Sequence, residues 1–216
     1  MQGKDIIFFD LDGTLTDSKE GIFASLRYAL RFFGITEQQD EALNRFIGPP
    51  LVQAFITYYH MSEQDAALAL VKYREYFSTK GIYQLSMYSG VDRMLKELKK
   101  RNFTLCLATS KPEQYAKEII SRIGVKDQFD YLAGATMDES RNEKKDIINF
   151  VIAQKGYDRS RILMVGDREH DVYGAHKNHV EVLGVLYGYG TKKELKDAGC
   201  NYFAKTVEDV EMFILS

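Results

Sequence analysis

The sequence has little of what marks an exported or membrane-bound protein. It contains only two cysteines in 216 residues, Cys106 and Cys200, and they are far apart and lack any Cys-His cluster at metal-ligand spacing. This pattern predicts reduced core thiols in apolar strands of a cytoplasmic protein. No apolar run approaches the length of a membrane span, and an acidic residue, Asp10, directly follows the short apolar run near the N-terminus. We therefore expect a soluble chain that is not exported.

The sequence also lacks an excess of charge of either sign. Twenty-nine Lys and Arg stand against 31 Asp and Glu, a formal net charge of −2, with no basic tail and no block of like charge. Neither a nucleic acid polymer nor a membrane surface is indicated as a partner. Internal repeats and low-complexity segments are absent as well, and the sequence leaves the oligomeric state open.

What the sequence does have is an alternation of short apolar runs with helical patterns. The runs are rich in Ile, Val, Leu and Phe and lie at residues 5–10, 104–109, 130–135, 162–167, 182–188 and 201–205. Strands that alternate with helices in this way predict βαβ units and a parallel sheet covered on both faces. The expected fold class is therefore α/β with a doubly wound parallel sheet.

One interval interrupts this alternation. Residues from about 18 to 85 contain no convincing strand and place their apolar residues at helical spacing. We expect an α/β core domain formed by residues 1–17 and 86–216, and an inserted helical domain at residues 18–85. Beyond the insertion, Ser89 is expected to cap the helix that begins near residue 90, and Pro112 to occupy the first position of another.

Polar residues follow several of the predicted strands at their carboxyl ends, where open α/β sheets bind ligands. They come from four elements: Asp10, Asp12, Thr109, Ser110, Lys144, Asp167 and Asp171. Carboxylates gathered in one place repel each other unless a cation is present, and an all-oxygen ligand set favours a hard ion such as Mg²⁺. A hydroxyl, an ammonium and Mg²⁺ together describe a site for a phosphoryl group.

These residues stand in motifs that resemble a known family. "DLDGT" at 10–14, "ATS" at 108–110, Lys144 and "GDREHD" at 166–171 resemble, in order, the four motifs of the haloacid dehalogenase-like (HAD) phosphohydrolases. The resemblance covers nearly the whole chain and includes a helical cap inserted after the first motif. Finer features, "DGTLTDS", "IGPPL" and "VGDREHDVYGA", resemble the phosphoglycolate phosphatase-like branch and its bacterial 5'-nucleotidase-like members.

The resemblance implies a Mg²⁺-dependent hydrolysis of a small phosphate ester. Asp10 would be the nucleophile that forms an aspartyl-phosphate, and Asp12 the general acid and base. Mg²⁺ would be held by the Asp10 carboxylate, the main-chain carbonyl of Asp12 and the Asp167 carboxylate, with Asp171 as a direct or water-mediated ligand. Thr109, Ser110 and Lys144 would bind phosphoryl oxygens. Alternate residues of an extended segment share a direction, so Asp10 and Asp12 are expected to face the phosphate together.

Each assignment has a structural alternative. Asp-Gly is a common turn pair, and Asp167, Asp171, Thr109 and Ser110 are residue types that cap helices. Lys145 directly follows Lys144, where the family commonly has proline, so the choice between the two lysines depends on spacing alone. The histidines near the fourth motif, at positions 170, 176 and 179, are expected to have solvent or helix-end roles.

The helical insertion bears on the substrate. Gly48 lies in a Gly-Pro-Pro turn, the kind of loop with which the family closes over the leaving group, so it is a candidate substrate-binding residue. Phe46, Tyr58 and Tyr59 are expected to be core residues of the insertion, with stacking on a base as the alternative.

Two other functions share these motifs at least in part. A phosphomutase of the same family would return the phosphate to a sugar. A phospho-accepting signalling module also combines aspartates, Thr or Ser and Lys around Mg²⁺, but it is much shorter and lacks the helical insertion. The sequence does not choose between phosphoglycolate, a nucleotide and a sugar phosphate as the substrate.

Overall fold

The chain folds into two compact units, each described here by itself. The computed structural model describes residues 3–37 and 39–216, so the first two residues of the expected core and Gln38 of the expected insertion lie outside it. The first unit comprises Met1–Thr16 and Met87–Ser216, and the second comprises Asp17–Ser86. These boundaries differ by one residue from the predicted ones.

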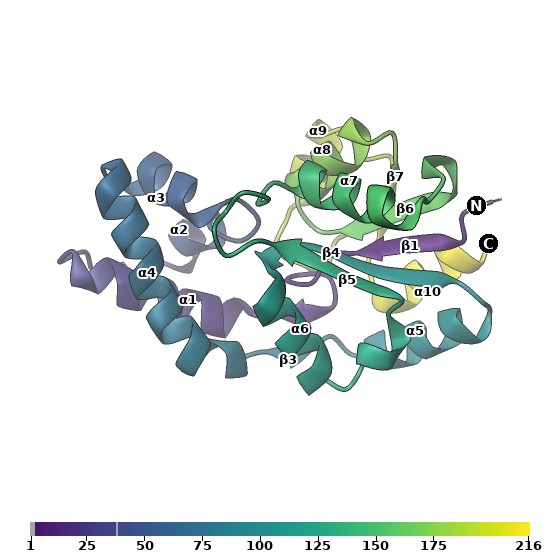
Figure 1. Ribbon diagram of the computed structural model, residues 1–216, viewed down its shortest axis with the longest axis horizontal. Helices are drawn as coiled ribbons and strands as arrows, with labels where there is room; N and C mark the ends of the chain where they lie inside the picture. Colours follow the sequence, from purple (N-terminus) through teal and green to yellow (C-terminus); the bar gives the residue numbers. More distant parts are fainter. Residues whose placement is uncertain (1–2, 38) are drawn as a thin grey trace. The chain divides into compact units, whose positions relative to one another are not determined.

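The first unit is built on a six-stranded parallel sheet with the order β5-β4-β1-β6-β7-β8, which confirms the predicted fold class (Figure 1). The strands are β1 (Ile6–Phe9), β4 (Thr104–Pro112), β5 (Tyr131–Ala135), β6 (Ile162–Gly166), β7 (Glu181–Val185) and β8 (Tyr202–Ala204). The first strand lies in the middle, between β4 and β6, and every residue of β1 is buried. Strands buried on both faces are apolar along their whole length, which is why the sequence shows runs rather than alternation.

Helices cover both faces of this sheet (Figure 1). In the first unit they are α5 (Val91–Lys100), α6 (Glu113–Arg122), α7 (Lys144–Lys155), α8 (Glu169–Lys177), α9 (Lys192–Asp197) and α10 (Val207–Leu215). The described residues also form three short 3₁₀ turns, η1 (Gly81–Tyr83), η2 (Lys126–Gln128) and η3 (Arg159–Arg161). The helices α7 and α8 begin just before or at the polar residues that the sequence singles out, so the packing of their apolar faces fixes where those residues lie.

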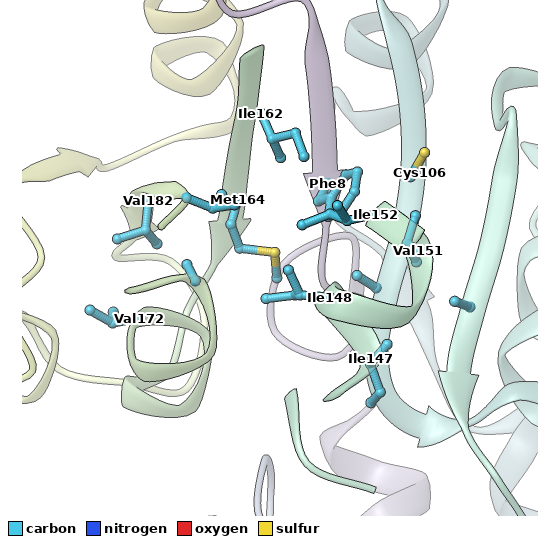
Figure 2. Packing of buried hydrophobic residues seen from close by; sticks show 14 of the residues in the cluster. Phe8, Cys106, Ile147, Ile148, Val151, Ile152, Ile162, Met164, Val172 and Val182 are labelled. Carbon is cyan, nitrogen blue, oxygen red and sulfur yellow. The ribbon is translucent and has the colours of Figure 1, made fainter. Parts of the chain in front are cut away.

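A buried cluster joins α7 and α8 to one face of the sheet. Met164 of β6 points toward Ile148 of α7 (Figure 2), and Phe8 of β1, Val151 of α7 and Val172 of α8 belong to the same buried cluster. Since successive strand residues point to opposite faces, Ile6 and Phe8 belong to this cluster whereas Ile7 and Phe9 do not. Burying a Phe or Met side chain stabilises a fold by roughly 1.5–3 kcal/mol, so this face anchors both helices.

The second unit is helical. It contains α1 (Lys19–Phe32), α2 (Asp40–Asn44), α3 (Leu51–Tyr59) and α4 (Glu63–Thr79). The apolar residues of α1 recur at helical spacing and are buried, as Ile22, Leu26 and Leu30 illustrate. Phe46 is buried with its ring 5.1–5.8 Å from the rings of Phe55, Tyr58 and Tyr59, so the expectation that it belongs to the core of this unit is confirmed.

Several local predictions need correction. Gly90, with φ of 88°, rather than Ser89, precedes α5 as its N-cap, and Pro112 is the N-cap of α6 rather than its first residue. Cys106 is buried in β4, but Cys200 is buried just before β8 rather than within a strand.

A second, two-stranded sheet joins β2 (Thr16–Asp17) to β3 (Ser86–Met87). No sequence pattern predicts this sheet, because two-residue strands carry no periodicity. These strands contain the residues at which the chain passes from one unit to the other. None of the helices formed by the described residues is long and apolar enough to cross a membrane.

Candidate active site

The loop that follows β1 places Asp10 at the carboxyl edge of the sheet. Asp10 donates its backbone N–H to the carbonyl of Val165 in β6, at 2.9 Å. The loop then turns tightly, because the carbonyl of Leu11 accepts hydrogen bonds from the backbone N–H groups of residues 14, 15 and 16. Gly13, at φ of 84°, supplies a backbone conformation that residues with a side chain rarely adopt.

Three of the predicted carboxylates come together in this unit. Asp10, Asp167 and Asp171 each offer one oxygen, and these oxygens all lie within 4.8 Å of one another. Asp167 follows β6 directly, and Asp171 projects from the first turn of α8. All three are buried, at 7%, 0% and 1% exposure. The parallel strands β1 and β6 thus bring together residues that lie more than 150 positions apart in sequence.

Lys144, the first residue of α7, lies against this cluster. Its Nζ is 2.7 Å from Asp10 Oδ1 and 2.7 Å from Asp171 Oδ1, and it donates a hydrogen bond to the carbonyl of Ala108 at 3.0 Å. Burial opposes the charged form of Lys144, but the two carboxylates outweigh that effect and raise its pKa above the ordinary value. Lys145, by contrast, is exposed and pairs with Glu143.

The negative charge of the three carboxylates exceeds the positive charge of the Lys144 ammonium that contacts two of them. Burial, followed by the charges of Asp171 and Asp10, raises the pKa of Asp167 well above its usual range. Burial also raises the pKa of Asp171, although Lys144 opposes that rise. Asp167 Oδ1 is buried and has no hydrogen-bond partner among the residues that the structure describes. A buried oxygen without a partner, inside a set of oxygen donors, fits a hard divalent cation such as Mg²⁺.

Asp171 also has the capping role that was its alternative reading. Its Oδ2 accepts a hydrogen bond from the backbone N–H of Arg168 at 3.1 Å, as part of a capping box at the start of α8. The other oxygen faces Lys144. The two roles are therefore compatible, since each uses a different oxygen of one carboxylate.

Asp12 does not belong to the three-carboxylate cluster. Its Oδ2 lies 2.9 Å from Nζ of Lys111, which the sequence analysis did not identify. The two aspartates of the first motif therefore have different cationic partners, Lys144 for Asp10 and Lys111 for Asp12. Asp12 Oδ1 is buried and, within the described part of the chain, has no hydrogen-bond partner.

Thr109 and Ser110 lie at the carboxyl end of β4, on the strand next to β1. Thr109 is buried, and its Oγ1 accepts a hydrogen bond from the backbone N–H of Lys111 at 3.2 Å. Ser110 is partly exposed. The alternative, that they are helix-start residues, does not describe this geometry, because Pro112 is the residue that precedes α6.

A glycine-rich loop after β7 completes the surroundings of Asp167. Tyr189 donates its backbone N–H to Asp167 Oδ2 at 2.7 Å, and Tyr187 donates its hydroxyl to the carbonyl of Thr14 at 3.0 Å. A Cβ atom on Gly188 would lie 2.3 Å from the carbonyl oxygen of Gly13, and one on Gly190 would lie 1.9 Å from that of Asp167. The glycines of "GVLYGYG" allow this close approach.

The remaining predicted residues have less to do with this cluster. His170 is partly buried, and burial lowers its pKa to about 4, with the cations Arg168 and Lys144 adding to the effect. His176 and His179 are exposed. Gly48 belongs to the helical unit, where it adopts φ of 115° in the turn before α3.

Comparison with known proteins agrees with this geometry. The family model described as haloacid dehalogenase-like hydrolase matches residues 7–185. A 5'-nucleotidase from Pseudomonas aeruginosa is 40% identical over 190 residues, which are 88% of this chain and 86% of that protein. The crystal structure of a predicted phosphatase from Clostridium acetobutylicum has a TM-score of 0.96 and 40% identity, with 98% of each chain covered.

A further relative is named for a different activity. The tyrosine-protein kinase PtkA from Mycobacterium tuberculosis is 36% identical over 185 residues, which are 86% of this chain and 63% of that protein. This chain therefore spans less than two thirds of the length of PtkA. The match of the family model to most of the chain, together with the 40% identity to the relative from Pseudomonas aeruginosa, is sufficient to assign the family. The chain belongs to the haloacid dehalogenase-like hydrolase family.

Proposed function

We propose that this protein is a Mg²⁺-dependent phosphatase that hydrolyses a small phosphomonoester through an aspartyl-phosphate on Asp10. One observation carries the proposal: the buried Asp10 carboxylate, at the carboxyl end of the central strand, is paired with Lys144 and clustered with Asp167 and Asp171. Family membership supports the same chemistry. The buried, unlinked thiols of Cys106 and Cys200 are compatible with a cytoplasmic enzyme.

In the first step a carboxylate oxygen of Asp10 attacks phosphorus. As the new O–P bond forms, the bond from phosphorus to the ester oxygen breaks, and that oxygen takes a proton from Asp12. In the second step Asp12 takes a proton from a water molecule, whose oxygen attacks phosphorus. Inorganic phosphate leaves and the Asp10 carboxylate is restored. Splitting hydrolysis in this way replaces one difficult displacement by two easier ones.

The residues that would hold Mg²⁺ are Asp10, Asp167 and Asp171, with the main-chain carbonyl of Asp12. Asp171 acts directly or through water. When bound, the ion would neutralise the carboxylates and polarise a phosphoryl oxygen. The protein contributes the fixed orientation of the carboxylates, since Tyr189 N–H holds one oxygen of Asp167 and leaves the other without a partner among the described residues.

The phosphoryl group would be bound by Thr109, Ser110 and Lys144. Lys144 is already paired with Asp10, so its charge both steadies the nucleophile and attracts the dianionic ester. Thr109 is held by the backbone of Lys111, and Ser110 is the more accessible of the two hydroxyls.

We further propose that the helical unit acts as a cap that restricts the substrate to small esters, with Gly48 in its substrate-binding loop. Support comes from the point of insertion, because the unit begins at Asp17, five residues after Asp12. Phosphoglycolate and nucleoside 5'-monophosphates are the first candidates, because relatives of this chain are named phosphoglycolate phosphatase and 5'-nucleotidase. A cap that closes over the site excludes bulky leaving groups and bulk water, so a folded phosphoprotein should be a poor substrate.

A screen of phosphomonoesters tests the proposal. Phosphate release from phosphoglycolate, nucleoside 5'-monophosphates, sugar phosphates and p-nitrophenyl phosphate is measured with Mg²⁺ and with chelator. We expect hydrolysis of at least one small ester with Mg²⁺ and none with chelator. Asp10→Asn should abolish it, whereas Asp127→Asn, the same change at an exposed carboxylate, should not. Full activity in chelator would contradict the mechanism.

Two further assays separate the alternatives. If phosphate is returned to a sugar rather than released, product analysis will identify a phosphomutase. Because PtkA is named a tyrosine kinase, ATP with a tyrosine-containing peptide is included as well. Phosphorylation of that peptide without hydrolysis of any ester would overturn the phosphatase assignment.

A further inference from the structure

Lys111 is a buried cation that the reaction proposed above does not yet use. Its side chain is 5% exposed, and its Nζ lies 2.9 Å from Oδ2 of Asp12, whose side chain is 13% exposed. Burying an ammonium group is costly unless a carboxylate is placed to meet it. A lysine would therefore be a poor choice at this position unless the carboxylate of Asp12 has to be held.

The backbone of β4 is shaped to bring Lys111 to this place. Thr109 pairs with Gly134 and Pro112 pairs with Ala135, so Ser110 and Lys111 are two extra residues on β4. Such bulges re-aim side chains at the edge of a sheet. Lys111 donates its N–H to Thr109 Oγ1 and so holds the bulge. The bulge also requires the glycine at position 134, because a Cβ there would lie 2.5 Å from the carbonyl oxygen of Lys111.

The ion pair between Lys111 and Asp12 is not needed to join β4 to the loop after β1. Strands β1 and β4 already pair from Ile6↔Thr104 to Phe9↔Leu107, and the loop after Asp10 has its own backbone hydrogen bonds to Leu11. A buried ion pair is also weak evidence for stability, since apolar residues of similar volume often serve as well. A structural role alone therefore leaves the choice of Lys and Asp unexplained.

The geometry of Asp12 suggests what the pair does. Lys111 engages Oδ2, whereas Oδ1 is buried and without a hydrogen-bond partner in the described part of the chain. An ion pair to one oxygen of a carboxylate fixes the side-chain rotamer of that residue. It therefore also fixes the direction in which the other oxygen points. Because proton transfer needs the donor and the ester oxygen within hydrogen-bond reach, this orientation controls how well Asp12 performs.

We infer that Lys111 is the positioning residue for Asp12: it holds Oδ2 and thereby directs Oδ1 toward the oxygen of the departing group. The inference rests on the proposed function, since it assigns a task within that reaction. Under this inference, the buried lysines Lys144 and Lys111 have different roles. Lys144 serves Asp10 and Asp171, and Lys111 serves Asp12.

The test compares two esters that differ in how much they need a proton donor. Nitrophenolate leaves as a stable anion, whereas an alkoxide does not. Lys111→Met, which keeps most of the length of the side chain and removes its charge, should lower kcat/KM, which reports the first step, for an alkyl phosphate about 10-fold more than for p-nitrophenyl phosphate. Lys111→Arg, which keeps a positive charge, should avoid most of this extra loss on the alkyl phosphate. Lys96→Met, which breaks an exposed pair with Asp92, should leave both rates unchanged.

A double-mutant cycle gives a second readout, one that a role of Lys111 independent of Asp12 would not produce. In an Asp12→Asn background, Lys111→Met should cause little further loss on the alkyl ester, because there is no longer a proton donor to orient. The double variant also removes both charges of the pair, so it remains informative if Lys111→Met alone fails to fold.

The outcomes are distinguishable. Equal losses on the two esters, or losses that multiply in the double variant, would overturn the inference while leaving the phosphatase activity in place. Inactivity of the wild-type protein on every ester would instead contradict the proposed function, and the inference with it. A leaving-group-dependent loss that Arg restores, absent in the Asp12→Asn background, supports the positioning role.

Discussion

The ammonium of Lys144 lies 2.7 Å from Oδ1 of Asp10, and both groups are almost completely buried. The same ammonium is 2.7 Å from Asp171, so one cation offsets two carboxylates while a third, Asp167, lies beside them. Lys144 is thus important for two separate properties. Its ammonium offsets the repulsion between the buried carboxylates, which stabilises the folded protein. It also places a positive charge beside the nucleophile of the proposed reaction.

Lys144→Met is predicted to lower both stability and activity. Removing one partner of a buried ionic cluster leaves the other charges uncompensated, which costs about 3 kcal/mol or more in the free energy of unfolding. Lys145→Met provides a matched control, because that neighbouring lysine is exposed and pairs with Glu143, also exposed. Urea unfolding in chelator and phosphatase assays with Mg²⁺ measure the two effects. Similar losses in both variants would refute the assignment of Lys144 over Lys145.

Asp12→Asn is predicted to separate the two steps of the reaction. The change removes a proton donor and a base, each worth on the order of 10²- to 10⁴-fold in rate. With p-nitrophenyl phosphate the first step should survive, since nitrophenolate needs little protonation. The second step should be slow. A rapid-mixing experiment should then show a burst of nitrophenol equal to the enzyme concentration, with phosphate trapped on Asp10. Wild-type rates without trapped phosphate would exclude an acid-base role for Asp12.

Asp167→Asn is predicted to stabilise the metal-free protein and to abolish most of its response to Mg²⁺. The carboxylate is fully buried beside two others, so a neutral amide relieves repulsion worth about 1 kcal/mol or more. Mg²⁺ at 100 times its dissociation constant should stabilise the wild type by about 2.7 kcal/mol, and the variant far less. Thermal unfolding with chelator and with Mg²⁺ measures both effects. Asp127→Asn should behave as the wild type does, and an undiminished Mg²⁺ response in Asp167→Asn would argue against the metal site.

The cysteines are predicted to be unreactive in the folded protein. Burial raises the pKa of Cys106 to about 12, and burial also raises the pKa of Cys200. A raised thiol pKa means less thiolate at a given pH, so at pH 8 Cys106 should react on the order of 10³-fold more slowly than an unperturbed thiol. Labelling with Ellman's reagent should be slow in buffer and yield two thiols per chain in denaturant. Rapid native labelling of Cys106 would contradict the burial of β4.

The sequence by itself determined the α/β class and most strand positions. Six apolar runs correspond to the six strands of the large sheet, because a parallel strand buried on both faces must be apolar throughout. The convergence of Asp10 and Asp167 could also be predicted, since parallel strands end at one edge. Spacing favoured Lys144 over Lys145, and the structure places Lys144 against Asp10 and Asp171.

Only the tertiary structure decided which charges meet. Alternation along the chain suggested that Asp10 and Asp12 face the same phosphate, but it gave no sign that they contact different lysines. Lys111 reaches Asp12 through a bulge in β4 that no sequence periodicity reveals, because a bulge is a change of register between two strands. Likewise, the glycine loop after β7 carries a visible composition, but its approach to Asp167 depends on the packing of β6 beside β7. Local sequence fixes where a strand ends, whereas contacts between residues distant in the chain depend on register and packing.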